Sequence, residues 1–393
     1  MDGSDLGFVV VIPTLCRYDL LGECLRSVAA SEVKPSEVCV VDNGGGFEPE
    51  PGVAERCALR VVRPGRNLGV GASWNLGHRL YAPRDVVLVN DDLTFDPEVL
   101  GRLVGSPHGI ASAVTEPRDW WSFFLQREAV WERVGEYDEG FWPGYYEDND
   151  YYRRIRLAGI EHGVVSVPTG AIRHRVSSTG GVAFTLFEWN GWRYVQKWGG
   201  GPDGERFDRP FNGQPETELD LFQRFSCTEP SNGRGHCAAL SELARGSGHV
   251  TRVGGWGLSP AVALLHARPR RFVEHNAATP PEFDYLDLLA RGAGIERVFH
   301  HDDSLAAPIE PTDVLMLDTI PSDDYVARLL DLHAPRVRRR IAVHAWPGPH
   351  EAPGPRPVVA EFLGRHPGWG VLADYPHENG MTVLARDDPG FVS

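Results

Sequence analysis

Apolar runs alternate with amphipathic segments along the first half of the chain. Residues 8–12, 38–41 and 86–89 are apolar at every position, which is typical of parallel strands buried on both faces. Between the first two runs, apolar residues recur at helical spacing over 20–28, so we predict a helix there. Strand–helix alternation of this kind predicts a mostly parallel sheet with right-handed crossovers. The other predicted elements of this half are a strand at 59–62 and a helix through Trp74, Leu76 and Leu80.

The second half of the chain shows the same alternation. Residues 249–253 predict a strand that runs into a glycine-containing turn, and a helix follows at 259–266. Further strands are predicted at 271–274, 313–318 and 340–344. Both halves therefore favour the α/β fold class, with strands and helices in turn.

A polar stretch separates the two halves. It begins near residue 199, is rich in Gly, Pro and Asn, and holds one predicted helix around Leu219. A chain of 393 residues is also longer than a typical single domain. We predict a first domain over 1–213, a linker over 214–235 and a second domain over 236–393.

Composition and charge exclude several classes of protein. The chain has 42% hydrophobic and 24% charged residues, which is typical of a soluble globular protein. Its net charge of −15 argues against broad electrostatic binding to nucleic acid or anionic membranes. No apolar run approaches the ~20 residues that span a membrane, and a secretory signal is absent from the sequence. The six cysteines form no CxxC pair, so we expect reduced cysteines in a cytoplasmic protein.

Two adjacent carboxylates, Asp91 and Asp92, follow the buried strand at 86–89. An unpaired charge beside a core is costly, so a partner is expected. A hard divalent cation that also binds phosphate oxygens suits two carboxylates. Alternatively, the pair opens a turn and caps a helix near residues 96–98.

Polar side chains also follow the other strands of this half. Thr14 and Arg17 come after the first strand, and Asp42 ends the second. The carboxyl ends of parallel strands face one side of a sheet, where ligands bind in open α/β folds. These side chains can therefore converge on one ligand, which favours an enzyme.

Five short motifs occur in order at familiar intervals. They are Val10–Thr14, Val40–Asn43, Arg66–Gly69, Asn90–Asp92 and Glu147–Asp150. Together they resemble a family 2 glycosyltransferase of the GT-A fold, over roughly the first two hundred residues. The resemblance implies a nucleotide-sugar-binding domain that moves a sugar from a nucleoside-diphosphate sugar, with a UDP-sugar favoured, to an acceptor hydroxyl. It also implies Mn²⁺ or Mg²⁺ and inversion at the sugar.

The resemblance assigns roles to residues of the sugar-donor site. Asp42 would hydrogen-bond the nucleobase, and Asp92 would be the metal ligand, with Asp91 as ribose or metal partner. The family's DxD-type motif reads Asn-Asp-Asp here, which leaves the division of roles between the two carboxylates open. The predicted substrate-binding residues are Pro13, Thr14, Arg17, Asp42, Asn67, Gly69, Asp91, Trp120 and Trp121.

The acidic cluster Glu147–Asp150 is the candidate general base. Sugar transfer needs a base for the acceptor hydroxyl and a cation for the charge on the leaving diphosphate. Carboxylates also cap helix N-termini, but a cap needs one carboxylate and this cluster has three. By the family's Glu-Asp pair, Asp148 is the base and Glu147 the second choice. Asp150 would orient the loop or pair with Arg153 or Arg154.

Three further side chains are candidates with open alternatives. His174 resembles a histidine that completes the metal site with Asp92 and Asp91; phosphate contact or a structural role are the alternatives. Trp120 and Trp121 precede the acidic cluster, and tryptophans stack on sugars or nucleobases. Packing in the core is the alternative for both.

The second half resembles a class I S-adenosylmethionine-dependent methyltransferase over residues 236–386, which implies a Rossmann-like domain. The sequence departs from that pattern, because Arg252 stands where a carboxylate is expected and Trp256 interrupts the glycine turn. We therefore expect a degenerate, inactive methyltransferase-like domain, with S-adenosylmethionine an improbable cofactor. The residues that would form its cofactor site are Gly254, Gly257, Glu274 and Asp318.

Three functions compete at this point. The first is a metal-dependent glycosyltransferase with an appended Rossmann-like domain. The second is an enzyme that glycosylates and then methylates one acceptor. The third is a nucleotide-sugar-binding assembly protein with dead sites. The acceptor stays open between a glycan, a protein side chain, a lipid-linked sugar and a modified DNA base, and so does a homo-oligomeric state.

Overall fold

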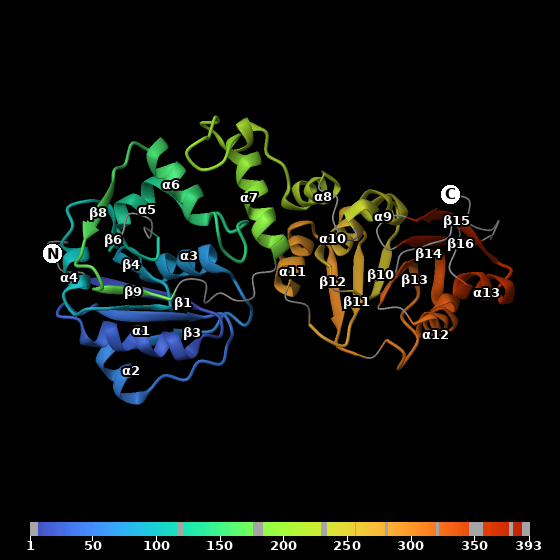
Figure 1. The fold of residues 1–393 in the computed structure, drawn as a ribbon, viewed down its shortest axis with the longest axis horizontal. Helices are drawn as coiled ribbons and strands as arrows, with labels where there is room; N and C mark the ends of the chain where they lie inside the picture. The colour runs from blue at the N-terminus through green and yellow to red at the C-terminus, as the bar shows by residue number, and fades with distance from the viewer. Residues whose placement is uncertain are drawn as a thin grey trace. The chain divides into compact units, whose positions relative to one another are not determined.

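The computed structural model divides the chain into two compact units, Met1–Gln214 and Pro215–Ser393, and each unit has its own seven-stranded sheet (Figure 1). The structure describes residues 7–115, 121–175, 184–228, 234–255, 257–279, 282–302, 304–319, 322–345, 357–376 and 380–386.

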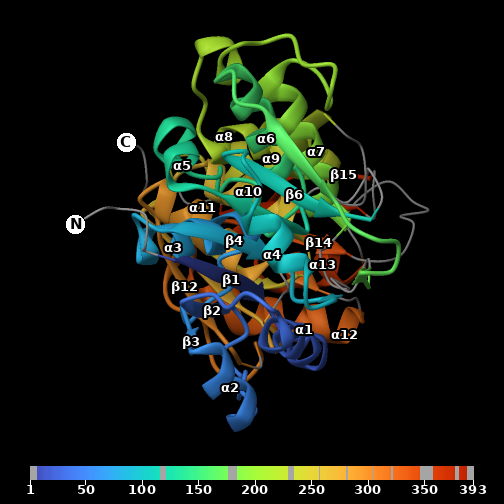
Figure 2. The ribbon, with the colours of Figure 1, turned by 90° about the vertical axis from the view of Figure 1, so that its left-hand side faces the viewer.

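The sheet of unit 1 has the strand order β3-β2-β1-β4-β7-β6-β8. Figure 2 shows β4, β1, β2 and β3 side by side in this order, and all four run parallel. Strand β7 is antiparallel to both of its neighbours, and β8 runs parallel to β6. The predicted, mostly parallel α/β sheet is thus found. The strands are β1 (Phe8–Thr14), β2 (Glu37–Asp42), β3 (Leu59–Val62), β4 (Asp85–Val89), β6 (Ile110–Val114), β7 (Phe123–Gln126) and β8 (His162–Ser166).

Helices cover both faces of this sheet. In Figure 1, α1 and α2 lie on one side of the strands, and α3, α5 and α6 lie on the other. The apolar stripe of α1 packs into one core cluster and Trp74 of α3 into the other. Strands β5 (Leu93–Phe95) and β9 (Ile172–His174) form a separate antiparallel ribbon. The helices are α1 (Tyr18–Ala30), α2 (Pro51–Cys57), α3 (Val70–Tyr81), α4 (Val99–Val104), α5 (Glu128–Val134), α6 (Glu147–Leu157), α7 (Phe184–Trp198) and the 3₁₀ helix η1 (Pro210–Gly213).

The sheet of unit 2 has the order β12-β11-β10-β13-β14-β16-β15. The first five strands are parallel, and β16 lies antiparallel between β14 and β15. In chain order this is 3-2-1-4-5-7-6, whose first five strands follow the doubly wound arrangement that holds ligands where the order reverses, between β10 and β13. The strands are β10 (His249–Gly254), β11 (Arg271–His275), β12 (Glu296–His300), β13 (Thr312–Thr319), β14 (Val337–Ala345), β15 (Trp369–Tyr375) and β16 (Met381–Arg386).

The helices of unit 2 include one in the predicted linker. Helix α8 buries Leu219, Phe222 and Phe225 and packs against α9 and α10, so it belongs to the core of this unit. Within the described parts of the chain, no helix is both long and apolar enough to cross a membrane. The helices are α8 (Glu218–Thr228), α9 (Cys237–Ala244), α10 (Leu258–His266), α11 (Phe283–Gly292), α12 (Asp323–His333), α13 (Pro357–Arg365), η2 (Arg234–His236) and η3 (Ala334–Arg336).

Candidate functional site

The Asp91–Asp92 pair lies in a turn at the carboxyl end of β4. The turn leads directly into β5, and α4 begins only at Val99, so the pair does not cap that helix. The Thr14 hydroxyl at the end of β1 donates a 2.6 Å hydrogen bond to Asp91 Oδ2. Burial raises the pKa of Asp91 to about 6. The structure therefore brings Thr14 and Asp91 together, as the parallel sheet predicts.

Asp92 faces His174 from the β5–β9 ribbon. Register places His174 opposite Leu93, and His174 Nε2 lies 3.1 Å from Asp92 Oδ1. The Asp92 side chain is 8% exposed. In the described residues, no group of three or more His, Cys, Asp or Glu side chains is arranged to hold a metal. Asp92 and His174 nevertheless fit a divalent cation, because such ions often take one or two protein ligands and complete their shell with substrate phosphates and water.

Asp42 is fully buried at the end of β2, and the chain uses both of its oxygens. Tyr18 Oη and the Gly45 amide donate to Oδ1, and the Phe47 amide donates to Oδ2. Arg63 Nε lies 3.6 Å from the same carboxylate. Asp42 thus orders the glycine loop after β2. A carboxylate has further lone pairs, so its predicted contact with a nucleobase stays a prediction.

The other residues predicted along β1 have contrasting surroundings. Pro13 lies inside β1 and pairs in register with Val41. Arg17 is 41% exposed and lies 3.3 Å from Asp19 at the start of α1. Arg17 thus has an exposed side chain near the strand ends, whereas Pro13 is held within the sheet.

Asn67 and Gly69 join the sugar-donor side of the site to the loop before α6. Asn67 Oδ1 accepts a hydrogen bond from the Gly69 amide, and the Asn67 carbonyl accepts one from Trp142 Nε1. Gly69 has φ of +81°, and a Cβ there would lie 2.9 Å from the Pro143 carbonyl oxygen. Glycine is therefore required, since the two loops touch through their backbones.

Arg66, the first residue of the same motif, is a functional candidate that we did not predict. Its Nη1 atom is buried and has no hydrogen-bond partner in the described chain. A buried guanidinium nitrogen without an acceptor is costly, so a ligand oxygen at this position would stabilise it. The sequence feature that could have revealed Arg66 is the Arg66–Gly69 motif, from which only Asn67 and Gly69 were predicted as binding residues.

The acidic cluster forms the first turn of α6, as predicted, and its members have different roles. Asp150 is fully buried and accepts hydrogen bonds from Arg154 Nε and Trp198 Nε1, each at 2.9 Å. Lys197 Nζ lies 2.5 Å from the same carboxylate. Asp150 is thus a structural residue paired with Arg154, while Arg153 binds the Phe207 carbonyl instead.

Glu147 and Asp148 are a coupled pair of carboxyl groups. Burial raises the pKa of both. The pKa of Glu147 is raised well above its usual value, first by burial and then by the charge of Asp148. Glu147 is 6% exposed, and its Oε2 atom has no hydrogen-bond partner among the described residues. The pair therefore favours a neutral Glu147, and the pKa of the half-buried Asp148 is raised less than that of Glu147.

Helix α7 holds this region in place through a second set of ion pairs that the sequence did not reveal. Lys197 Nζ bridges Asp138 and Asp150, each at 2.5 Å. Arg193 Nη1 lies 2.9 Å from Asp138 Oδ2. These cations hold the pKa of Asp138 well below its usual range. Asn190 Nδ2 also donates to the Trp142 and Gly144 carbonyls of the loop before α6.

The two predicted tryptophans have different outcomes. Trp121 stacks on His162 with 5.2 Å between ring centroids and meets Phe124 edge-on at 5.0 Å. These contacts are those expected if Trp121 packs in the core, the alternative to stacking on a sugar or nucleobase. Trp120 lies outside the described residues, and its role stays a prediction.

In unit 2, Arg252 occupies the crevice where the strand order reverses. Its Nη2 atom lies 2.6 Å from Asp318 Oδ2, and its Nη1 atom lies 3.4 Å from Glu274 Oε1. Nη2 also donates to the Gly257 carbonyl at 3.0 Å. The predicted cofactor carboxylates are thus paired with Arg252, which holds the pKa of Asp318 below its usual range. Gly254 ends β10 beside this cluster, and Trp256 lies outside the described residues.

Comparison with known proteins finds a family match within the first unit. Residues 9–107, about a quarter of the chain, match the family model Glycosyl transferase family 2. No curated protein matches the chain. Among solved structures, the chain is similar to the mannosyltransferase PcManGT from Pyrobaculum calidifontis in complex with GDP-Man and Mn²⁺, at 16% identity over 66% of this chain and 72% of that chain, with a TM-score of 0.37.

It is also similar to S. aureus TarS, at 14% identity over 62% of this chain and 48% of that chain, with a TM-score of 0.36. TarS in complex with UDP-GlcNAc matches at 13% identity over 60% of this chain and 71% of that chain, with a TM-score of 0.36. Such low values carry no argument about this chain. The family match supports the resemblance of residues 9–107 to glycosyltransferase family 2. A methyltransferase-like character of unit 2 stays a prediction.

Proposed function

We propose that unit 1 transfers a sugar from a nucleoside-diphosphate sugar, with a UDP-sugar as the favoured donor, to an acceptor hydroxyl with inversion. One observation carries the proposal. The Leu68 amide of the Asn67–Gly69 loop donates to Asn43 Oδ1, and the Asn43 amide donates to the Thr14 carbonyl at the strand ends. The same loop contacts the loop that leads into Glu147 and Asp148. A nucleotide site and a candidate base are thus built on connected segments, as a two-substrate transfer needs.

Asp92 and His174 would hold Mn²⁺ or Mg²⁺, and the metal would neutralise charge that develops on the leaving diphosphate. Arg66 supplies a second positive group through its unpaired buried nitrogen. Asp91, which accepts a hydrogen bond from Thr14, would bind the ribose. These residues bind and orient the sugar nucleotide, and the backbone contact at Gly69 keeps the base loop against them.

Asp148 acts as the general base in this proposal. It removes the proton of the acceptor hydroxyl while that oxygen forms a bond to the anomeric carbon. The bond from that carbon to the diphosphate breaks, and the leaving group takes the electron pair. Glu147 stays protonated beside it, because its pKa is raised well above the usual value. A single ionised base on the acceptor side suits direct displacement and therefore inversion.

Release of nucleoside diphosphate from a panel of sugar nucleotides, with and without Mn²⁺, tests the proposal. We expect metal-dependent release and, for Asp92→Ala, loss of Mn²⁺-dependent nucleotide binding in calorimetry. Asp96→Ala is the matched control, because Asp96 lies on the same segment and pairs with exposed Arg173. Unchanged Mn²⁺-dependent affinity in Asp92→Ala would contradict the metal role. Anomeric analysis of the product decides between inversion and retention.

A further inference from the structure

The edge of the unit 2 sheet at which its parallel strands begin carries a cluster of arginines. Strands β10, β11, β13 and β14 run parallel, so they begin at the same edge. Arg270 reaches this edge from the turn before β11, since a Cβ on Gly248 would lie 3.3 Å from Arg270 Nη2. We call the cluster the arginine edge, and its members are Arg245, Arg270, Arg336, Arg338, Arg339 and Arg340.

Hydrogen bonds attach two arginines of β14 to the segment before β10. Arg339 Nη1 donates to the Gly246 carbonyl at 3.3 Å, and Arg340 Nη1 donates to the Leu243 carbonyl at 2.6 Å. Both acceptors are uncharged, so neither bond neutralises its guanidinium group. Burial and the charge of Arg339 lower the pKa of Arg340, as expected for like charges held close together.

Two carboxylates offset part of the charge of the arginine edge. Asp313 Oδ1 lies 3.3 Å from Arg338 Nη1, and Glu242 Oε2 lies 2.9 Å from Arg245 Nε. Neighbouring Arg271 is not counted in the edge, because it pairs with two other glutamates. In the described chain, the six guanidinium groups of the edge thus have two carboxylates as ion-pair partners, and positive charge is in excess there.

Exposed aliphatic side chains lie at the same end of this sheet. In the outer strand β15, Gly370 is in register with Ala385 of β16, which is in register with Arg340 of β14. Val371 follows directly and is 43% exposed, and Leu372 is 55% exposed at a break in the β15–β16 register. Apolar side chains exposed on an edge strand favour contact with another apolar surface. Arginines and aliphatic side chains thus occur together on one part of the surface of unit 2.

We propose that this part of unit 2 binds a membrane surface that contains anionic phospholipids. Guanidinium groups form paired hydrogen bonds with phosphate oxygens, and exposed aliphatic side chains enter the boundary between headgroups and acyl chains. The aliphatic pair Val371 and Leu372 favours lipid over nucleic acid as the source of the phosphates. The net charge of −15 is spread over the whole chain, and salt at 0.15 M largely screens charges more than about 8 Å away. The proposal does not depend on sugar transfer by unit 1.

Co-sedimentation of the full chain with vesicles tests this proposal. One set of vesicles contains phosphatidylcholine alone, and the other contains phosphatidylcholine and phosphatidylglycerol in equal parts. We expect the chain to bind the mixed vesicles, to leave the phosphatidylcholine vesicles unbound, and to lose binding as the salt concentration is raised. Equal binding to both sets, or binding to neither, would overturn the proposal.

Substitutions locate the binding surface. Arg336→Gln and Arg338→Gln change exposed side chains and should each weaken binding to mixed vesicles about fivefold, the usual contribution of one arginine near an anionic membrane. Leu372→Ser should weaken it about tenfold, because its apolar surface is no longer buried in lipid. Arg26→Gln is the matched control, since Arg26 is an exposed arginine of unit 1 that pairs with one carboxylate, as Arg338 does.

The same variants distinguish lipid from other polyanions. The three substitutions in unit 2 should weaken binding to mixed vesicles and Arg26→Gln should not, while circular dichroism shows that each variant is folded. Unchanged vesicle binding in Arg336→Gln and Arg338→Gln would show that the arginine edge is not the contact surface. Binding of duplex DNA that is tighter than binding of mixed vesicles at the same salt concentration would assign the surface to nucleic acid and overturn the proposal.

Discussion

Glu147 and Asp148 are neighbours in the chain, but their environments separate their chemistry. Glu147 is almost fully buried, and the charge of Asp148 further opposes its ionisation. Asp148 is half-buried, and its Oδ1 atom accepts a 2.7 Å hydrogen bond from the Asn149 amide. When environments push two pKa values apart, the group that ionises more easily is the base. At the residue scale, this difference favours Asp148 as the base in the proposed function.

Replacing Asp148 by Asn should therefore lower kcat by a factor on the order of 10²–10⁴, because general-base catalysis typically contributes a rate factor of that size. Binding of the sugar nucleotide should be preserved. Steady-state transfer rates and calorimetric nucleotide binding check both parts. Should the Asn variant turn over near the wild-type rate while Glu147→Gln is inactive, the base is Glu147 instead.

The raised pKa of Glu147 also predicts how the stability of the protein depends on pH. The pKa of Glu147 in the folded chain is raised above the usual 4.5. Below about pH 4.5 the protonated side chain contributes its full stabilisation to the folded state, and this contribution is lost as the pH rises through the folded-state pKa. Glu147→Gln should therefore gain stability relative to wild type as pH rises above 4.5, by up to about 1.4 kcal/mol per pH unit in that window. Urea unfolding at several pH values measures the difference.

Glu161→Gln is the control for this stability series, because Glu161 is exposed and lies just beyond α6. A Glu147→Gln difference from wild type that changes with pH no more than the Glu161→Gln difference would show that the assignment of a neutral Glu147 is wrong.

At the scale of elements, α7 stabilises the turn that carries the base. Lys197 lies between Asp138 and Asp150, and Arg193 adds a second cation on Asp138. Removing one partner of a buried ion pair leaves an uncompensated charge, which typically costs 3–5 kcal/mol. Because Arg193 and Arg154 still contact the two carboxylates, the low end of that range applies here.

Lys197→Met should therefore lower the free energy of unfolding of unit 1 by about 3 kcal/mol. Denaturant unfolding measures it, with Lys34→Met as control, since Lys34 is exposed and binds one backbone carbonyl. Loss of less than about 0.5 kcal/mol, the usual range for surface changes, would show that Lys197 is not needed to compensate the two carboxylates.

The sequence predicted the elements whose pattern is strong. Fully apolar strands such as β1 and β4, and the apolar stripe of α1, appear where expected. Strand β6 was not predicted, because the buried run Ile110–Val114 contains alanines and a serine and does not read as apolar. Short β5 and β9 carry no repeat long enough to detect.

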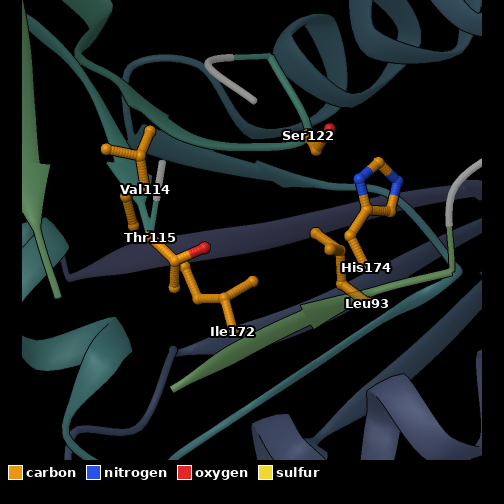
Figure 3. A pocket seen from close by; sticks show the side chains of 7 residues that line it. Leu93, Val114, Thr115, Ser122, Ile172 and His174 are labelled. Carbon is orange, nitrogen blue, oxygen red and sulfur yellow. The ribbon is translucent and has the colours of Figure 1, made fainter. Parts of the chain in front are cut away.

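The contacts of the candidate site likewise divide into those that the sequence predicted and those that it did not. Strand ends placed Thr14 and Asp91 together, because parallel strands end at one edge of the sheet. The Lys197 bridge joins residues 47 and 59 positions apart, and periodicity has no information on such contacts. A cavity of about 200 Å³ beside His174 is likewise lined from separate elements, so its lining residues Thr115 and Ser122 were not predicted (Figure 3).

At the scale of the whole molecule, the two units differ in whether the charged side chains at their strand ends already have partners within the chain. In unit 1, Asp92 faces His174 and Arg66 has an unpaired buried nitrogen, so the site is ready for a ligand. In unit 2, Arg252 pairs with Asp318 and Glu274, and Arg297 pairs with Glu274 as well, so both carboxylates have cationic partners within the chain. A crevice whose carboxylates are already paired offers little to a cationic cofactor.

We therefore predict that the full chain does not bind S-adenosylmethionine. Calorimetry up to the high micromolar range would saturate an ordinary ~1 µM site, and Mn²⁺-dependent UDP binding by the same sample shows that the protein is folded. The physical reason is Arg252, whose guanidinium repels a sulfonium. It also lies close against the glycine turn, since a Cβ on Gly255 would lie only 2.1 Å from Arg252 Nη2. Arg252→Ala should lower the free energy of unfolding by about 3 kcal/mol, the low end of the cost of breaking a buried ion pair, because Arg297 still contacts Glu274 and His344 still contacts Asp318. Arg252→Lys should recover part of that loss. Clear S-adenosylmethionine binding by the wild-type chain, or a methylated product, would instead make the enzyme bifunctional.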